Sequence, residues 1–299
     1  MKVRNCFIKA LLPLMAASAV VFSCKPSGEA LKTKVFAFED TTAHASVKVS
    51  AELPADKDGI SIQIAEILCH ELDDRLSRVT SYEGERFFDP YKGDPGDHEA
   101  CVKYYFDNVK ALLGRLAQED ADERTSWLEE DPELTPERKA EILAEMPGWE
   151  YEYSLTKIED EPAYVVFQSQ DYIYMGGAHG GVGGDGCLTF DKMNGHFVKT
   201  LIESEKAAQM QPLLEKGLME YFTAAGETMT AEELRGNLFI EGDIIPLPAW
   251  QPYPSEDGLV FTYQQYEIAP YAAGMPGFVL PYAEVEPFLT EDAAKMLRQ

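Results

Sequence analysis

The sequence predicts an α+β fold in which helices pack on an antiparallel β-sheet, with two similar-sized α/β subdomains forming one compact unit. Three patterns support this prediction. Apolar and polar residues alternate in strand-like segments, of which Trp149 to Leu155 is the clearest. Other segments place their apolar residues at helical spacing. Between Trp149 and Lys199, four strand-like segments follow one another through turns, as in an antiparallel meander.

The first 23 residues have the composition of a secretion signal. Three basic residues precede an apolar segment, Ala10 to Phe22, that is too short to span a bilayer. The segment runs into Val21-Phe22-Ser23-Cys24, which resembles the lipobox of bacterial lipoproteins. We therefore expect a lipoprotein signal peptide over residues 1–23, lipidation of Cys24 and a tether over residues 24–34. Ordinary cleavage beside an incidental cysteine is the alternative.

The chain is strongly acidic. Its 52 Asp and Glu residues against 26 Lys and Arg give a formal charge of −26, and loss of the three basic residues before Cys24 would make it −26 − 3 = −29. Such a surface repels nucleic acid and anionic lipid headgroups. It would steer a basic partner toward the protein, although acidity can also serve solubility alone.

Residues 35–148 are expected to form an N-terminal α+β domain. Ala45 to Ala51 alternates like a strand, and Ile60 to Val79 repeats apolar residues at the spacing of an amphipathic helix. A second helix would bury an apolar face between Val102 and Leu116. These elements supply both a sheet strand and helices to cover it.

An acidic stretch without periodicity follows, over residues 118–134, and we expect it to be a solvated, irregular insertion. Thr135-Pro136 then has the cap and first-turn proline of a short helix that ends near Met146.

Residues 149–299 are expected to form the C-terminal α+β domain. Its first part is the meander described above. Next come a helix from Leu201 to Ala225, a short helix opened by the capping box Thr230 to Glu233, and two strands near Leu259 to Glu267 and Gly277 to Pro281.

The most unusual stretch is Asp171 to Asp191, which combines an aromatic strand, seven glycines and His179. Gly181 to Gly186 matches the G-x-G-x-x-G spacing of dinucleotide-binding loops, but that motif requires a helix directly after it. Cys187 to Phe190 instead alternates like a strand, so we reject a nucleotide site. The glycines are expected to let a long strand reverse.

His179 is the obvious candidate for catalysis, because imidazole titrates near neutral pH. A histidine between glycines can equally cap a turn, and no nucleophile or metal-binding motif accompanies it. We therefore expect no catalytic residue, no cofactor and no metal site. Calcium binding by Asp89, Asp94, Asp97 and Glu99 is a weaker alternative to an ordinary exposed turn, because their spacing fits no EF-hand.

The cysteines leave one alternative open. Cys69 and Cys101 lie on the two predicted N-terminal helices, where an oxidising compartment would allow them to form a bridge. Buried free thiols suit their apolar settings equally well.

Two separated segments resemble a known bacterial envelope domain. Tyr172 to Gly180 with the Thr189 to Gly195 hairpin, and Gly258 to Gly274, are similar to the RsiV-like family, which includes the outer part of a lysozyme-sensing anti-sigma factor and accompanies the deacetylase PdaC. The resemblance covers roughly Trp149 to Leu289. It implies an α+β domain that binds a lysozyme-type protein in one relative. Neither the membrane helix of that factor nor the deacetylase domain is seen, so signalling and deacetylation are not implied.

From this resemblance we expect a non-catalytic, lipid-anchored envelope protein that binds a basic protein such as a lysozyme, or a peptidoglycan fragment. Tyrosines carry much interface energy, although strand tyrosines also pack against their neighbours. A cell-wall hydrolase or deacetylase-associated enzyme and a purely structural lipoprotein are the alternatives. The expected binding residues are Tyr172, Tyr174, Gly176, Gly177, His179, Tyr266 and Tyr271.

Overall fold

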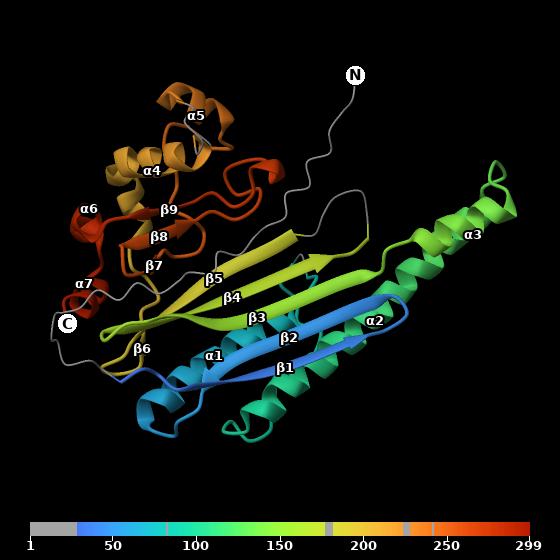
Figure 1. The fold of residues 1–299 in the computed structure, drawn as a ribbon, viewed down its shortest axis with the longest axis horizontal. Coiled ribbons are helices and arrows are strands. Elements are labelled where there is room, and N and C mark those ends of the chain that lie inside the picture. The colour runs from blue at the N-terminus through green and yellow to red at the C-terminus, as the bar shows by residue number, and fades with distance from the viewer. Residues whose placement is uncertain (1–28, 82, 177–181, 224–227, 241) are drawn as a thin grey trace, which may run out of the picture.

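The computed structural model describes residues 29–81, 83–176, 182–223, 228–240 and 242–299, and it confirms the α+β class (Figure 1). A large sheet has the strand order β1-β2-β3-β4-β5-β6, and a small sheet the order β7-β8-β9. The strands are β1 (Thr33–Thr41), β2 (Ala45–Pro54), β3 (Trp149–Asp160), β4 (Tyr164–Tyr174), β5 (Val182–Asp191), β6 (His196–Phe197), β7 (Tyr253–Pro254), β8 (Leu259–Thr262) and β9 (Gly277–Leu280).

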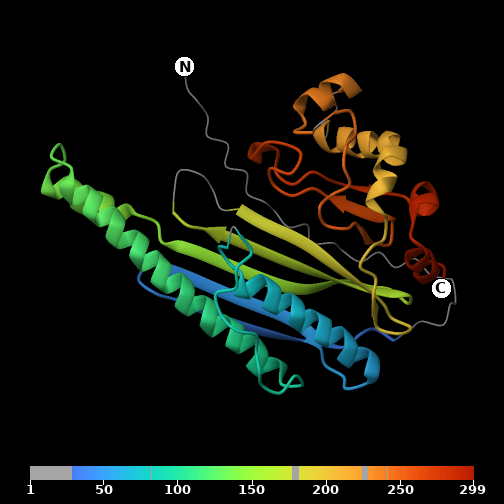
Figure 2. The same cartoon turned by 180° about the vertical axis from the view of Figure 1, so that it is seen from behind.

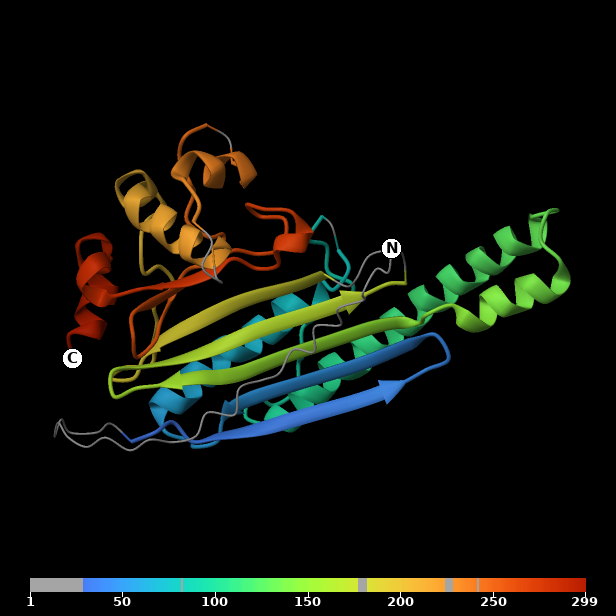
Figure 3. The same ribbon diagram turned by 45° about the horizontal axis from the view of Figure 1, so that its top comes forward.

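All neighbouring strands are antiparallel except β2 and β3, which run parallel. The antiparallel run β3 to β6 is the predicted meander. β1 was not predicted as a separate strand, and it takes Thr33 and Lys34 out of the expected tether. It forms one edge of the large sheet, at the bottom in Figure 3.

Helices α1 (Gly59–Ser77) and α2 (His98–Glu130) cover one face of the large sheet (Figure 2). α1 begins where the Asp58 carboxylate accepts the backbone N–H groups of Ile60 and Ser61. Its leucine and isoleucine stripe is fully buried against β2 to β5 and α2, because only one side of the helix meets the sheet. Both predicted N-terminal helices are therefore present.

The expectation of an irregular insertion over residues 118–134 is wrong, because α2 continues as a helix to Glu130. Beyond Ala117 the helix projects past the sheet together with α3 (Pro136–Glu145), so no side is buried and no apolar period appears (Figure 1). An i,i+4 ion pair between Arg124 and Asp120 supports this exposed part. α3 starts as predicted, with Thr135 as its cap.

The small sheet has its own core. The Thr230 capping box is present as predicted, and β8 ends at Thr262, earlier than expected. Tyr164 and Val166 of β4 also pack into this second core, whereas Val165 and Phe167 face the first. The helices of this part are η1 (Ser204–Lys206), α4 (Ala207–Phe222), α5 (Ala231–Asn237), η2 (Tyr271–Ala273), α6 (Tyr282–Val285), η3 (Glu286–Phe288) and α7 (Glu291–Leu297).

The two cores do not divide the chain at residues 148 and 149, where the domain boundary was expected. β2 pairs with β3 over seven residues, from Ala45 with Trp149 to Ala51 with Leu155, so the large sheet crosses that position. The second core instead draws most of its residues from the chain after β6. In the part of the chain that the structure describes, no helix is long and apolar enough to cross a membrane.

Candidate functional site

Strand β5 is rich in glycine because neighbouring groups occupy the space where its side chains would lie. A Cβ on Gly184 would come within 2.7 Å of Oδ1 of Asp171, and a Cβ on Gly186 within 2.5 Å of Cε3 of Trp250. Real Cβ atoms do not approach other atoms so closely, so each glycine permits one of these contacts. Gly184 and Gly186 thus serve close packing at a sheet edge.

Two glutamine side chains cover that edge. The backbone N–H of Gly183 donates to Oε1 of Gln265 at 3.1 Å, and the N–H of Asp185 donates to Oε1 of Gln264 at 2.8 Å. Nε2 of Gln264 returns a bond to the carbonyl oxygen of Asp185 at 2.8 Å. These amides satisfy backbone groups that a further strand would otherwise pair with. They fix the loop after β8 to the large sheet.

Tyr266 follows these glutamines in a conformation that costs energy. Its φ is +64°, in the left-handed region, and its side chain is 54% exposed. Glu267 holds the loop in place, because its carboxylate accepts the backbone N–H groups of Gln264 at 2.7 Å and Ala249 at 2.6 Å. A strained, exposed aromatic residue on an anchored loop is a candidate for recognition.

The structure brings two tyrosines of the second segment singled out in the sequence into ring contact. The ring of Tyr266 lies 5.7 Å from that of Tyr271, centroid to centroid, with an interplanar angle of 36°. Tyr172 is 40% exposed and pairs with Gly183, whose other side meets Gln265. Tyr172 and the Tyr266 loop therefore flank one glycine of β5. We call Tyr172, Tyr266 and Tyr271 the aromatic surface.

The other predicted binding residues differ in position. Tyr174 is half-buried at the end of β4. Gly176 has a φ of +68°, and Nη2 of Arg124 bonds its carbonyl oxygen at 3.0 Å, so this glycine serves a turn that α2 holds in place. Gly177, His179 and Cys24 lie outside the described residues.

Sequence reasoning missed a charged cluster beneath β5. Arg75 of α1 stacks on Trp250, 4.4 Å from the ring centroid, and forms ion pairs with Glu71 at 3.0 Å and Asp171 at 3.2 Å. Burial raises the pKa of the Asp171 carboxyl, and the charge of Arg75 offsets part of that shift. Arg75 and Glu71 precede Asp171 and Trp250 by 96 positions or more in the sequence. No local sequence pattern could therefore reveal the cluster.

Asp185 is a second carboxyl with a pKa raised by burial, although hydrogen bonds from Gln168 oppose the shift. It pairs with Gln170, the neighbour of Asp171 on β4, so the carboxyls of Asp171 and Asp185 point to opposite faces of the sheet. The pair therefore cannot act from one side on a single bond.

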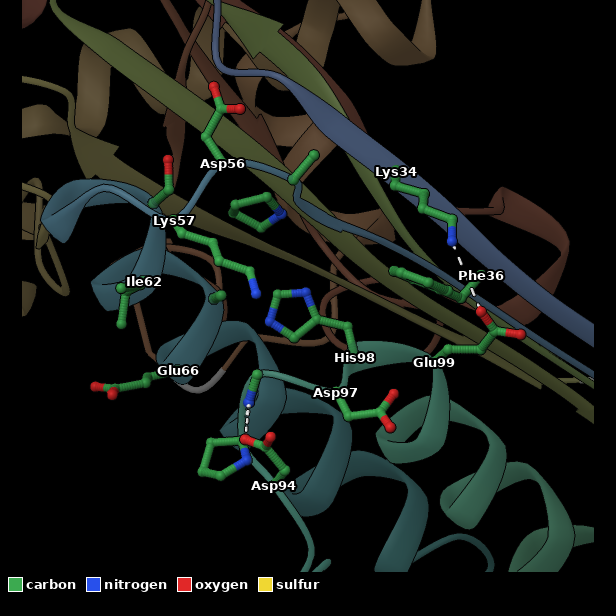
Figure 4. A pocket seen from close by; sticks show the side chains of 16 residues that line it. Lys34, Phe36, Asp56, Lys57, Ile62, Glu66, Asp94, Asp97, His98 and Glu99 are labelled. Atoms are coloured by element: carbon green, nitrogen blue, oxygen red, sulfur yellow. Dashed lines mark hydrogen bonds and ion pairs between the residues drawn. The ribbon is translucent and has the colours of Figure 1, made fainter.

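A cavity of about 620 Å³ lies at the other end of the sheet, where β1 begins and α1 and α2 start (Figure 4). His98 and Lys57 extend into it, and burial lowers the pKa of the His98 imidazole. Asp97 caps α2 and Asp94 accepts the N–H of Gly96, while Asp89 pairs with Lys92 and Glu99 with Lys34. All four carboxylates of the suggested calcium loop therefore have partners within the chain. The described residues contain no group of His, Cys, Asp and Glu that could hold a metal ion.

Cys69 and Cys101 are free thiols in the structure. A hydrogen bond between them lowers the pKa of Cys69 and raises that of Cys101, so the two side chains are neighbours on α1 and α2 as the sequence suggested.

The fold and this site define an α+β protein in which a smaller unit is fastened to a glycine-rich edge of a larger sheet. Residues 199–283, which include Gln264, Gln265 and Tyr266, match a family model described as a protein of unknown function (DUF3298). No curated protein matches the sequence.

Two solved structures share the fold. One is a member of the DUF3298 family (BF2082) from Bacteroides fragilis NCTC 9343, with a TM-score of 0.57, 17% identity, and coverage of 91% of this chain and 100% of that chain. The other is a DUF3298 family protein (PA4972) from Pseudomonas aeruginosa PAO1, with a TM-score of 0.53, 16% identity, and coverage of 89% and 97%.

Proposed function

We propose that this chain is an exported protein, anchored through a lipid on Cys24, that binds another macromolecule of the cell envelope through its aromatic surface. The observation that carries the proposal is the strained and exposed Tyr266 on a loop that Gln264 and Gln265 fix to β5. Strained residues of this kind cluster at active sites and ligand-binding sites. A fixed loop also loses little entropy on binding, which favours affinity.

The partner that fits best is a basic protein of the lysozyme type. The chain has a formal charge of −26, which speeds encounter with a cationic partner. The resemblance of Tyr172 to Gly180 and of Gly258 to Gly274 to the RsiV-like family points to the same partner. A peptidoglycan fragment is the second choice, because tyrosine rings also pack against sugars.

Calorimetric titration with a lysozyme at about 0.15 M salt tests this function, because long-range charge attraction is largely screened there. We expect Tyr266→Ala and Tyr172→Ala each to weaken binding about tenfold or more. Trp127→Ala is the matched control, since Trp127 is an exposed aromatic residue on the projecting part of α2. A complex that ignores both tyrosine substitutions, or that exists only at low salt, would contradict specific binding by this surface.

A cell-wall hydrolase is the competing class. Raised carboxyl pKa values, as in Asp171 and Asp185, are typical of general acids, but these two groups face opposite sides of the sheet. Turnover of peptidoglycan fragments that is lost in His179→Ala or Asp185→Asn, without loss of fold, would overturn the non-catalytic proposal. A purely structural lipoprotein would give neither turnover nor a complex.

A further inference from the structure

Strand β1 presents a row of backbone groups on the outer edge of the large sheet. The carbonyl oxygen of Lys32 accepts the N–H of Ala55 at 2.8 Å, and the N–H of Thr42 donates to Ala45 at 2.7 Å. Even-numbered residues of β1 therefore direct their backbone groups toward β2. The odd-numbered Val35, Ala37 and Glu39 direct theirs outward.

This edge lacks two common protections against pairing. Its register with β2 runs without a bulge from Thr33 to Thr41, and it contains no proline. Among the described residues, no strand lies on its outer side. Only at Thr41 is an outward N–H occupied, by Oδ1 of Asp40 at 2.8 Å.

The side chains of the even-numbered residues lie on the face that α2 covers. Lys34 forms an ion pair with Glu99 at 3.6 Å, and Asp40 forms one with Lys110 at 3.0 Å (Figure 4 shows the first pair). Phe38 stacks on Phe106 of the same helix. One end of β1 is thus cationic on this face and the other end anionic.

We propose that β1 pairs antiparallel with β1 of a second copy of this chain, about a two-fold axis that passes beside Ala37. In this register, the numbers of two residues that face each other across the interface add up to 74. Ala37 faces Ala37, and Val35 faces Glu39, so all the outward backbone groups of these residues meet partners. The two large sheets become one continuous sheet, and the contact is isologous.

The strand sequence suits this register. Lys34 faces Asp40 of the second copy and Phe36 faces Phe38, both in non-hydrogen-bonded pairs, where opposing side chains come closest. Because Lys34 already contacts Glu99 and Asp40 already contacts Lys110, a row of alternating charges forms across the interface. The row runs from Glu99 through Lys34 to Asp40 and Lys110 of the second copy. The two-fold axis generates a second, identical row in the same interface.

Charged residues on an edge strand usually discourage pairing. Here the antiparallel register places opposite charges face to face, so they favour this one partner over a strand of arbitrary sequence. The net charge of −26 on each copy opposes association, and salt near 0.15 M screens that repulsion. The inference is independent of the proposed function, because β1 lies at the edge opposite β5 and β6.

Sedimentation equilibrium of the full chain with Cys24→Ala, so that no lipid drives assembly, tests the proposal at about 0.15 M salt. We expect a dimer. Ala37→Pro should abolish it while leaving the fold intact, because the N–H it removes points away from β2. Lys34→Asp and Asp40→Lys should each weaken it about tenfold, since each places like charges opposite each other twice.

Mixing the two charge variants decides the register. In a mixed dimer, position 34 of each copy again faces an opposite charge at position 40 of the other copy. We therefore expect the mixture to dimerise as strongly as the parent, and each variant alone to dimerise more weakly. Arg115→Asp is the control, because it breaks a similarly exposed surface ion pair away from β1. A monomer at every concentration, or a dimer that survives Ala37→Pro, would overturn the proposal, as would a mixture that stays monomeric.

Discussion

The backbone N–H of Gly183 donates to the side-chain oxygen of Gln265 at 3.1 Å, so a loop more than 80 residues away in sequence completes the edge of β5. Together with Gln264, this bond positions Tyr266 beside the large sheet. The stability of this edge and the binding of a partner are therefore expected to depend on the same few groups.

Gln264→Leu should lower the free energy of unfolding by about 2 kcal/mol, because the N–H and C=O of Asp185 lose their partner in a partly buried place. Gln170→Leu is the control, since this amide is exposed on β4. Urea denaturation measures both. Equal, small effects of the two substitutions would show that the glutamine cover is dispensable.

Tyr266→Gly should be more stable than Tyr266→Ala by about 1 kcal/mol, because glycine adopts the left-handed backbone without steric cost. Both variants should lose partner binding equally, since both lack the ring. Thermal unfolding and titration of the same samples separate the two effects. An alanine variant as stable as the glycine variant would argue against strain at this position.

Gly186→Ala should destabilise the protein by about 2 kcal/mol, because its Cβ would meet Cε3 of Trp250. The cost should shrink when Trp250→Leu is already present, which a double-mutant cycle measures. Gly236→Ala is the control. That glycine lies in α5 with open space around it, so alanine there should stabilise slightly.

Two half-buried carboxyls, those of Asp171 and Asp160, should respond to pH in opposite directions. Burial raises the pKa of Asp171, so its ionisation disfavours the folded state, and its contribution to stability should fall as pH rises above about 4. Burial opposes ionisation of Asp160 too, but bonds from Lys157 and Lys192 lower its pKa. The contribution of Asp160 to stability should therefore be lost as pH falls below about 4.

Unfolding curves of the parent protein, Asp171→Asn and Asp160→Asn across acid pH check these signs. The advantage of the parent over Asp171→Asn should shrink with rising pH, and its advantage over Asp160→Asn should grow. An NMR titration that places the pKa of the Asp171 carboxyl below the ordinary range of aspartate would contradict the sign expected for Asp171.

Cys24→Ala should release the protein from the membrane fraction, because the expected lipid attaches at that thiol. Cys6→Ala, in the basic part of the leader before the apolar segment, should leave it bound. Fractionation followed by mass spectrometry of the mature N-terminus measures both. Unchanged association without a lipid would rule out this anchor.

The sequence predicted elements whose burial is one-sided. α1 repeats its apolar residues because one face meets the sheet, and the first half of β3 alternates for the same reason. The second half of α2 went unrecognised because it projects from the sheet and is exposed on all sides. β1 was missed because, as an edge strand, it buries little beyond parts of Phe36 and Phe38.

The candidate site was predictable only in part. The tyrosines stood out by composition, but the glycines of β5 could not be explained without Trp250, Asp171 and the two glutamines that approach them. Likewise, the Arg75 cluster draws on residues from α1, β4 and the loop before β7, which are far apart in the sequence. Contacts between segments far apart in the chain leave no periodic trace in the sequence.

The parallel pairing of β2 with β3 bears on how the chain reaches its native state. Trp149 follows the last residue of β2, Pro54, by 95 positions, and everything between them must be accommodated before the centre of the sheet can close. Such distant contacts slow folding. Until Leu155 has been synthesised or translocated, β2 pairs with β1 along one edge, and the backbone groups along its other edge have no β3 to pair with. A chaperone that shields these two strands during that interval would prevent premature association.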